Sequence, residues 1–185
     1  MLARSSAVWA NVNLRDVPRD RLIANLKSTM IQFEEQGKPV LAYRFGFLRV
    51  PFEEDRSRDG LALHIWTKSL PADDCPHTHI FDLQSRVLLG AVTNMIWTID
   101  DSKDGQFIAT KPGYSHPGVL EYESQKRLNL VRKSFDTYTA GTACDYYELP
   151  KGNIHSSSFE SDTVTLIRRS NTIPDELPTN YIPEG

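Results

Sequence analysis

The sequence predicts an all-β protein, an antiparallel β-barrel with one N-terminal α-helix packed outside it. Short runs with alternating apolar and polar residues recur from residue 40 to residue 169, and turn residues separate them. Before them, residues 16–37 have a helical repeat of apolar residues. The 185 residues contain no internal repeat and no linker-like boundary, so we expect one domain over 1–185 with a sizeable core.

The helix is expected over 16–37. Asp16, Val17 and Pro18 are typical of a helix start, with a capping carboxylate and a proline in the first turn. Gly37, followed by Pro39, is typical of its end. Its apolar side chains fall on one stripe, which we expect to pack against the barrel: Leu22, Ile23, Leu26, Met30 and Phe33.

The barrel is expected over 40–169. In order, the strand-like runs are Val40–Pro51, Leu61–Lys68, the stretch after Cys75, Val87–Ile99, Gln106–Thr110, Val119–Ser124, Leu128–Thr139, Ala143–Glu148, the stretch after Gly152 and Thr163–Arg168. The Pro/Gly-rich run 111–118 predicts an ordered loop. The tail 170–185 contains three prolines, so we expect it to be extended and to cover a barrel edge.

Composition excludes several partners. The net charge is −3 and basic residues are dispersed, which argues against nucleic acid or an anionic membrane as a partner. No apolar run approaches the roughly 20 residues of a membrane span. The first residues lack the apolar core of a signal peptide, and two cysteines, Cys75 and Cys144, fit a reducing compartment. We therefore expect a cytoplasmic protein that binds a small-molecule substrate and can form a homodimer.

Two stretches contain histidines in a pattern suited to a metal. His77 and His79 stand one residue apart, and in a strand their Cα atoms would lie about 7 Å apart on one face. Far along the chain, a Pro-x-Gly turn leads into a strand that opens with His155. Neutral imidazoles bind Fe, Zn, Cu, Ni and Mn, so the ligand type alone does not select the metal. Three core histidines with ordinary polar partners are the alternative.

These two stretches resemble the motifs of the cupins. In the first motif, His77 and His79 match the H-x-H, Gln84 occupies the glutamate position and Gly90 closes the motif one residue early. In the second, Pro150, Gly152 and His155 match in register. Cys144 stands where a glycine is expected, with Gly141 nearby, and Phe159 replaces an asparagine. The resemblance implies a jelly-roll barrel that holds one divalent metal ion through His77, His79 and His155.

The resemblance also implies roles for neighbours of the metal. Glutamine is a neutral and poorer ligand than glutamate, so we expect a three-histidine site in which Gln84 bonds a bound water or ligand. Three-histidine iron sites of thiol dioxygenases have a similar ligand set, so Fe(II) is the favoured metal, with Zn, Ni, Mn or Cu as alternatives. His64, on a strand near the barrel entrance, is a candidate acid/base group.

Arg86 is the candidate for binding a substrate anion. It follows Gln84 by two residues, and strand alternation would turn it to the face of the ligands. Its planar guanidinium suits a carboxylate or a phosphate. An internal ion pair with Asp82 or Glu148 is the alternative. Arg44 and Lys68 are weaker candidates, and five aromatic residues could line the pocket or pack in the core: Tyr43, Trp66, Trp97, Tyr146 and Tyr147.

The favoured function is a small metal-dependent oxidoreductase, an Fe(II) dioxygenase or oxidase acting on a small carboxylate-bearing substrate such as an amino-acid derivative. A Zn, Ni or Mn isomerase, lyase or hydrolase that does not use O₂ is the first alternative. A non-catalytic barrel that binds a small molecule is the second.

Overall fold

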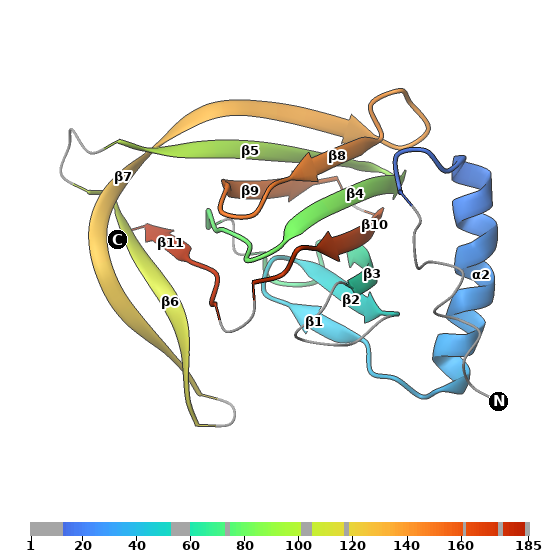
Figure 1. Cartoon of the computed structure of the whole chain (residues 1–185), viewed down its shortest axis with the longest axis horizontal. Helices are drawn as coiled ribbons and strands as arrows, with labels where there is room; N and C mark the ends of the chain where they lie inside the picture. Colours follow the sequence, from blue (N-terminus) through green and yellow to red (C-terminus); the bar gives the residue numbers. More distant parts are fainter. Residues whose placement is uncertain are drawn as a thin grey trace.

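The computed structural model describes residues 13–52, 60–72, 75–100, 105–116, 119–160, 162–173 and 176–183. Within these ranges the chain forms one helix, α2 (Arg19–Glu35), and eleven strands in two antiparallel sheets (Figure 1). The prediction of a mainly antiparallel β protein with one helix is confirmed.

The first sheet has six strands in the order β1-β2-β3-β10-β4-β8. Every neighbouring pair in it is antiparallel. The strands are β1 (Leu41–Tyr43), β2 (Phe47–Pro51), β3 (Gly60–Trp66), β10 (Thr163–Ser170), β4 (Asp82–Leu89) and β8 (Tyr146–Leu149).

The second sheet has five strands in the order β11-β6-β7-β5-β9. They are β11 (Asn180–Pro183), β6 (Phe107–His116), β7 (Val119–Thr139), β5 (Ala91–Asp100) and β9 (Ile154–Phe159). The long β7 curves around one side of the molecule and pairs first with β6 and then with β5 (Figure 1). Three short strands, Gln106–Thr110, Val119–Ser124 and Leu128–Thr139, and a loop over 111–118 were expected here. Instead β6 continues through Pro112, which is tolerated because β11 pairs only with 107–110 and leaves Pro112 at an edge.

The expected closed barrel is replaced by two sheets that face each other, an arrangement compatible with a jelly-roll β-sandwich. Among the described residues, no strand ladder joins the two sheets. The chain passes from one to the other at Gly90, between β4 and β5, where φ is +71° and an added Cβ would lie 2.4 Å from the Thr163 hydroxyl. Only glycine fits such a crossing. Side chains of both sheets then fill the space between them, among them Phe47, Trp66, Val87, Ile167, Val92 and Phe159.

Helix α2 covers the opposite, outer face of the six-stranded sheet (Figure 1). Leu22, Leu26 and Phe33 of the predicted stripe are buried, and they pack on sheet residues such as Leu61 and Leu166. The helix begins after Pro18 and ends before Gly37, whose φ is +60°. The inner face of this sheet is therefore left for the space between the sheets.

The segment before β4 is held between β9 and β11. His77 exchanges two main-chain hydrogen bonds with His155, at 2.8 and 2.9 Å. On the other side, the Thr78 amide donates to the Thr179 carbonyl and the Tyr181 amide donates to the Pro76 carbonyl. Strand β11, which belongs to the proline-containing tail, thus fixes the His-x-His segment from one edge while β9 fixes it from the other.

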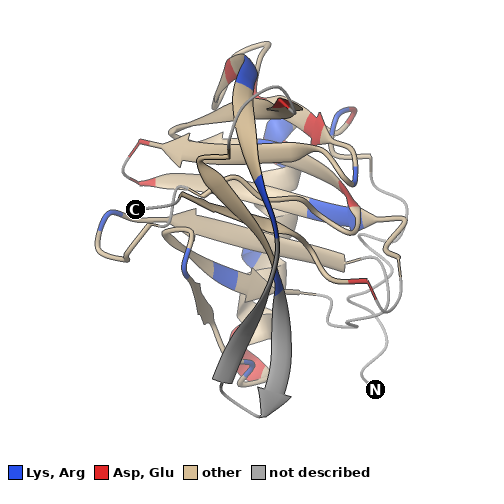
Figure 2. Cartoon of the chain, turned by 90° about the vertical axis from the view of Figure 1, so that its left-hand side faces the viewer, with Lys and Arg blue, Asp and Glu red and all other residues tan. Residues whose placement is uncertain are grey.

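In the ribbon of Figure 2, the Lys and Arg segments (blue) and the Asp and Glu segments (red) are scattered over several strands and loops. In the part of the chain that the structure describes, no helix has the length and apolar character needed to cross a membrane.

Candidate metal centre and its cavity

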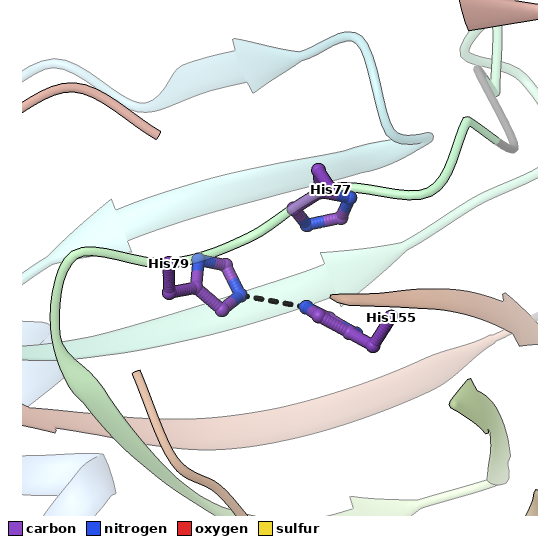
Figure 3. Close-up of side chains that lie close together, drawn as sticks. All are labelled: His77, His79 and His155. Carbon is purple, nitrogen blue, oxygen red and sulfur yellow. Dashed lines mark hydrogen bonds between the residues drawn. The ribbon is translucent and has the colours of Figure 1, made fainter. Parts of the chain in front are cut away.

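Three histidine side chains converge between the sheets (Figure 3). One ring nitrogen of each of His77, His79 and His155 can be chosen so that all three atoms lie within 4.8 Å of one another. The Nε2 atoms of His79 and His155 are 2.8 Å apart. Two imidazole nitrogens on neighbouring coordination positions of one metal, at about 2.0–2.1 Å from it, would lie about 3 Å apart. The separation therefore fits two ligands of one ion.

The local backbone explains why these residues meet. The paired main chains of His77 and His155 put both side chains on adjacent positions. The Pro-x-Gly turn makes the second link, because the Gly152 amide donates to the His79 carbonyl at 2.9 Å. Gly152 has φ +78°, a conformation that glycine adopts without strain. The turn residues of the second motif thus bind directly to the backbone of the first.

Protonation favours metal binding as well. The Nδ1 atom of His77 lies 3.2 Å from the Cys75 carbonyl, which can only accept, so in this contact Nδ1 carries the proton and the lone pair is on Nε2. Burial, and then the neighbouring histidines, holds the pKa of His79 and of His155 well below the ordinary value. Neutral imidazoles at neutral pH are what a divalent cation requires. The donor set fits one divalent metal ion.

A cavity of about 240 Å³ adjoins the three histidines. Aromatic rings hold two of them in position: Phe45 stacks on His77 with ring centroids 4.4 Å apart, and Phe81 stacks on His79 at 4.7 Å. The aromatic residues that line this cavity are Tyr43, Phe45, Phe47, Trp66, Phe81 and Tyr147. The histidines therefore face a small and largely apolar space.

His64 lines the same cavity, from the inner face of β3. Its ring stacks on Phe47 with centroids 4.0 Å apart. Burial lowers the pKa of His64 to about 3, with smaller contributions from the positive charges of Arg49 and Arg169. The imidazole is therefore neutral at neutral pH and suits a hydrogen-bond acceptor, but a pKa this low makes it a weak base for the expected acid/base role.

Gln84 and Arg86 lie on the opposite face of β4 from the one expected. Leu83 faces the cavity and Val87 the core between the sheets, so the alternate residues Gln84 and Arg86 point outward. The Gln84 amide lies 3.4 Å from Glu148. The expectation failed because the cupin motif put Gln84 in the inward position of its glutamate, and Arg86 was then placed by alternation from Gln84. Alternation from His79 is preserved instead: Phe81 and Leu83 line the cavity, and the even-numbered residues of β4 turn away from it.

Arg86 instead ties the N-terminal segment to the six-stranded sheet. Its Nε atom lies 2.9 Å from a carboxylate oxygen of the buried Asp145. Its Nη1 atom donates to the carbonyls of Leu14 and Arg15, at 3.1 and 3.0 Å. An internal ion pair was the alternative to substrate binding, but the partner is Asp145 and not Asp82 or Glu148. These contacts give Arg86 a structural role.

Two cavity arginines, Arg49 and Arg169, were missed. The signal for Arg49 was present, because Tyr43, Phe45 and Phe47 were assigned to one face and Arg49 continues that series. The sequence contained no comparable signal for Arg169, because only the pairing of β10 with β3 brings this residue to the cavity. Of the five aromatic candidates, Tyr43, Trp66 and Tyr147 line the cavity, whereas Trp97 packs near Phe107 and Tyr146 donates a hydrogen bond to Glu148.

No protein-family model matches the sequence, and no curated protein matches it. Two solved structures overlap with part of the fold. One is hydroquinone 1,2-dioxygenase from Sphingomonas sp. TTNP3 with 4-hydroxybenzoate bound, at 12% identity and a TM-score of 0.39, over 71% of this chain and 69% of that one. The other is hydroquinone 1,2-dioxygenase PnpCD with Cd²⁺ and 4-hydroxybenzonitrile, at 12% identity and a TM-score of 0.39, over 72% and 68%. Similarity of this extent indicates neither a shared family nor a shared reaction.

Proposed function

We propose that this chain is a metal-dependent oxidoreductase of the cupin type, a dioxygenase or oxidase that binds Fe(II) through His77, His79 and His155. The observation that carries the proposal is the convergence of these three imidazoles, two of them held neutral, beside a cavity sized for a small organic molecule. Three protein ligands leave coordination positions free, which is typical of a catalytic and not a structural metal site.

When bound, Fe(II) would supply the redox chemistry by which O₂ reacts with an organic substrate. The side chains of the protein do the rest. The aromatic walls exclude water and orient the substrate. Burial raises the pKa of Tyr147 to about 12, so its hydroxyl, which contacts Ser85 and Asn94, stays protonated in the cavity wall. The neutral His64 can accept a hydrogen bond from a bound molecule.

A second candidate is a Zn, Ni or Mn enzyme that catalyses isomerisation, elimination or hydrolysis without O₂. The three imidazole donors beside the cavity favour it as well, because Zn, Ni and Mn bind the same donor set and could act there as Lewis acids. Single-domain organisation, a cytoplasmic location and a homodimer stay predictions of the sequence.

Oxygen uptake tests the proposal. The protein is purified without chelator, its metals are quantified, and it is then loaded with Fe(II) under anaerobic conditions. We expect O₂ consumption with at least one member of a panel of small aromatic and aliphatic carboxylates. The same panel should give none with His155→Ala, and Gln84→Ala, altered outside the cavity, should behave as the wild type.

The outcomes separate the candidates. Zinc, nickel or manganese in the purified protein, with no O₂ uptake after iron loading, would favour the second candidate. A protein that takes up none of these metals would overturn both and leave a non-catalytic binding protein.

A further inference from the structure

Two arginines that line the cavity, Arg49 and Arg169, give it a positive electrostatic potential. Arg49 on β2 is 8% exposed and lies directly across from His64 of β3 in the strand pairing. Arg169 on β10 lines the same cavity. Both positive charges lower the pKa of His64, so both act on one ring at the cavity wall.

Arg49 has no carboxylate partner in the described ranges. No hydrogen bond or ion pair joins its guanidinium to another described side chain, and the ion pair formed by Arg86 and Asp145 lies on the other face of the sheet. A buried cation without a counter-ion is strongly unfavourable. Since no carboxylate of the described residues supplies the anion, we look to a ligand in the cavity as its source.

Arg169 is held in place for the same task. Its guanidinium carbon lies 5.3 Å from the centre of the Phe81 ring, a cation–π geometry. Its Nη2 atom is 2.6 Å from where a Cβ on residue 60 would lie, so Gly60 leaves the space that the guanidinium fills. A larger residue at position 60 would shift the end of the Arg169 side chain. Gly60 therefore leaves room for the second charge at this place.

The remaining walls and the size of the cavity define the rest of the ligand. The six aromatic residues named above supply flat apolar surfaces. A dry apolar cavity of about 150 Å³ accommodates benzene. At about 240 Å³, this cavity has room for one ring with small substituents.

We propose that Arg49, with Arg169 beside it, is the anion subsite of this cavity, and that the ligand is a small aromatic carboxylate. The carboxylate binds Arg49 and the ring lies against the aromatic wall. That this ligand is the substrate rests on the proposed function; that it binds here does not. The subsite replaces Arg86 as the anion anchor.

Binding of benzoate and of its neutral isostere benzamide tests the proposal, by calorimetry or by quenching of tryptophan fluorescence, since Trp66 lines the cavity. We expect benzoate to bind wild type about tenfold or more tightly than benzamide. Arg49→Met should abolish this preference by weakening benzoate alone, and Arg49→Lys should restore part of it. Arg132→Met, at an arginine that lies over Phe135 on β7 outside the cavity, is the matched control and should bind as wild type.

Each measurement is made on chelator-treated and on metal-loaded protein. Equal affinity of wild type for benzoate and benzamide overturns the proposal without any variant. Benzoate binding unchanged in both Arg49→Met and Arg169→Met overturns it too. Charge-selective binding that depends on Arg49 in a protein without O₂ uptake would uphold the subsite and reject the proposed oxidoreductase.

Discussion

His77 and His155 are joined by two main-chain hydrogen bonds, amide to carbonyl in both directions, at 2.8 and 2.9 Å. Almost eighty residues separate them in sequence, yet this pairing fixes two candidate ligands before any side chain contributes. The Gly152 amide adds His79 through its carbonyl. Main-chain hydrogen bonds therefore position the three candidate ligands. Substitutions that disturb this part of the main chain should lower the affinity for a metal ion.

Gly152→Ala should lower both stability and metal affinity. Its φ of +78° costs a residue with a Cβ about 1 kcal/mol. Gly141→Ala is the matched control, since Gly141 has φ +75° and neither glycine has an atom within 4 Å of an added Cβ. Thermal melts should show similar losses for both variants, and metal titration a loss for Gly152→Ala only. Equal metal affinity in the two would mean that the turn does not position His79.

Gln84→Ala should retain its metal, because Gln84 lies beside Glu148 outside the cavity. Gln84→Glu, which restores the residue of the cupin motif, should not tighten binding either. Metal content after dialysis measures both. A large gain in Gln84→Glu would show that this side chain reaches the ion.

Arg86→Met should destabilise the fold and leave the cavity intact. It removes the partner of Asp145, which is 5% exposed, and an uncompensated buried carboxylate costs about 3 kcal/mol or more. Urea denaturation measures the loss. Adding Asp145→Leu to Arg86→Met should recover part of it, because the second substitution removes the unpaired charge. A variant that keeps full stability would argue against this ion pair.

His64 should make the protein acid-sensitive. Its pKa is about 3 when folded and near 6.5 when unfolded, so the unfolded chain binds a proton first as pH falls. The contribution of neutral His64 is complete above about pH 6.5 and is lost progressively below it, at up to about 1.4 kcal/mol per pH unit. Unfolding free energies of the chelator-treated protein between about pH 7 and about pH 5 should fall less steeply in His64→Phe than in wild type. Parallel curves would mean that His64 is not buried as a neutral ring.

The sequence predicted those features that depend on residues close together along the chain. The H-x-H and Pro-x-Gly spacings predicted which histidines meet, and the apolar stripe predicted the buried face of α2. Gln84 and Arg86 were placed wrongly because Gln84 was given the inward position of the cupin glutamate, whereas alternation from His79 through Phe81 and Leu83 turns both residues outward. Alternation would also have placed Arg49 correctly, because Arg49 follows Phe45 and Phe47 at intervals of two residues and lines the same cavity.

Features that depend on distant pairings could not be predicted. Whether a set of strands closes into one barrel or forms two sheets depends on which edges meet, and no local pattern encodes that. The same holds for Arg169, which reaches the cavity through the pairing of β10 with β3 and through the space above Gly60.

Anaerobic Fe(II) titration of chelator-treated protein, followed by calorimetry, tests the central claim most directly. The account predicts one ion per chain in wild type and in Gln84→Ala. It predicts binding at least about a hundredfold weaker in each of His77→Ala, His79→Ala and His155→Ala. The reason is that each substitution removes one of the three protein ligands. Wild-type protein that binds no iron, or a His155→Ala variant that binds it as tightly as wild type, would contradict the three-histidine site.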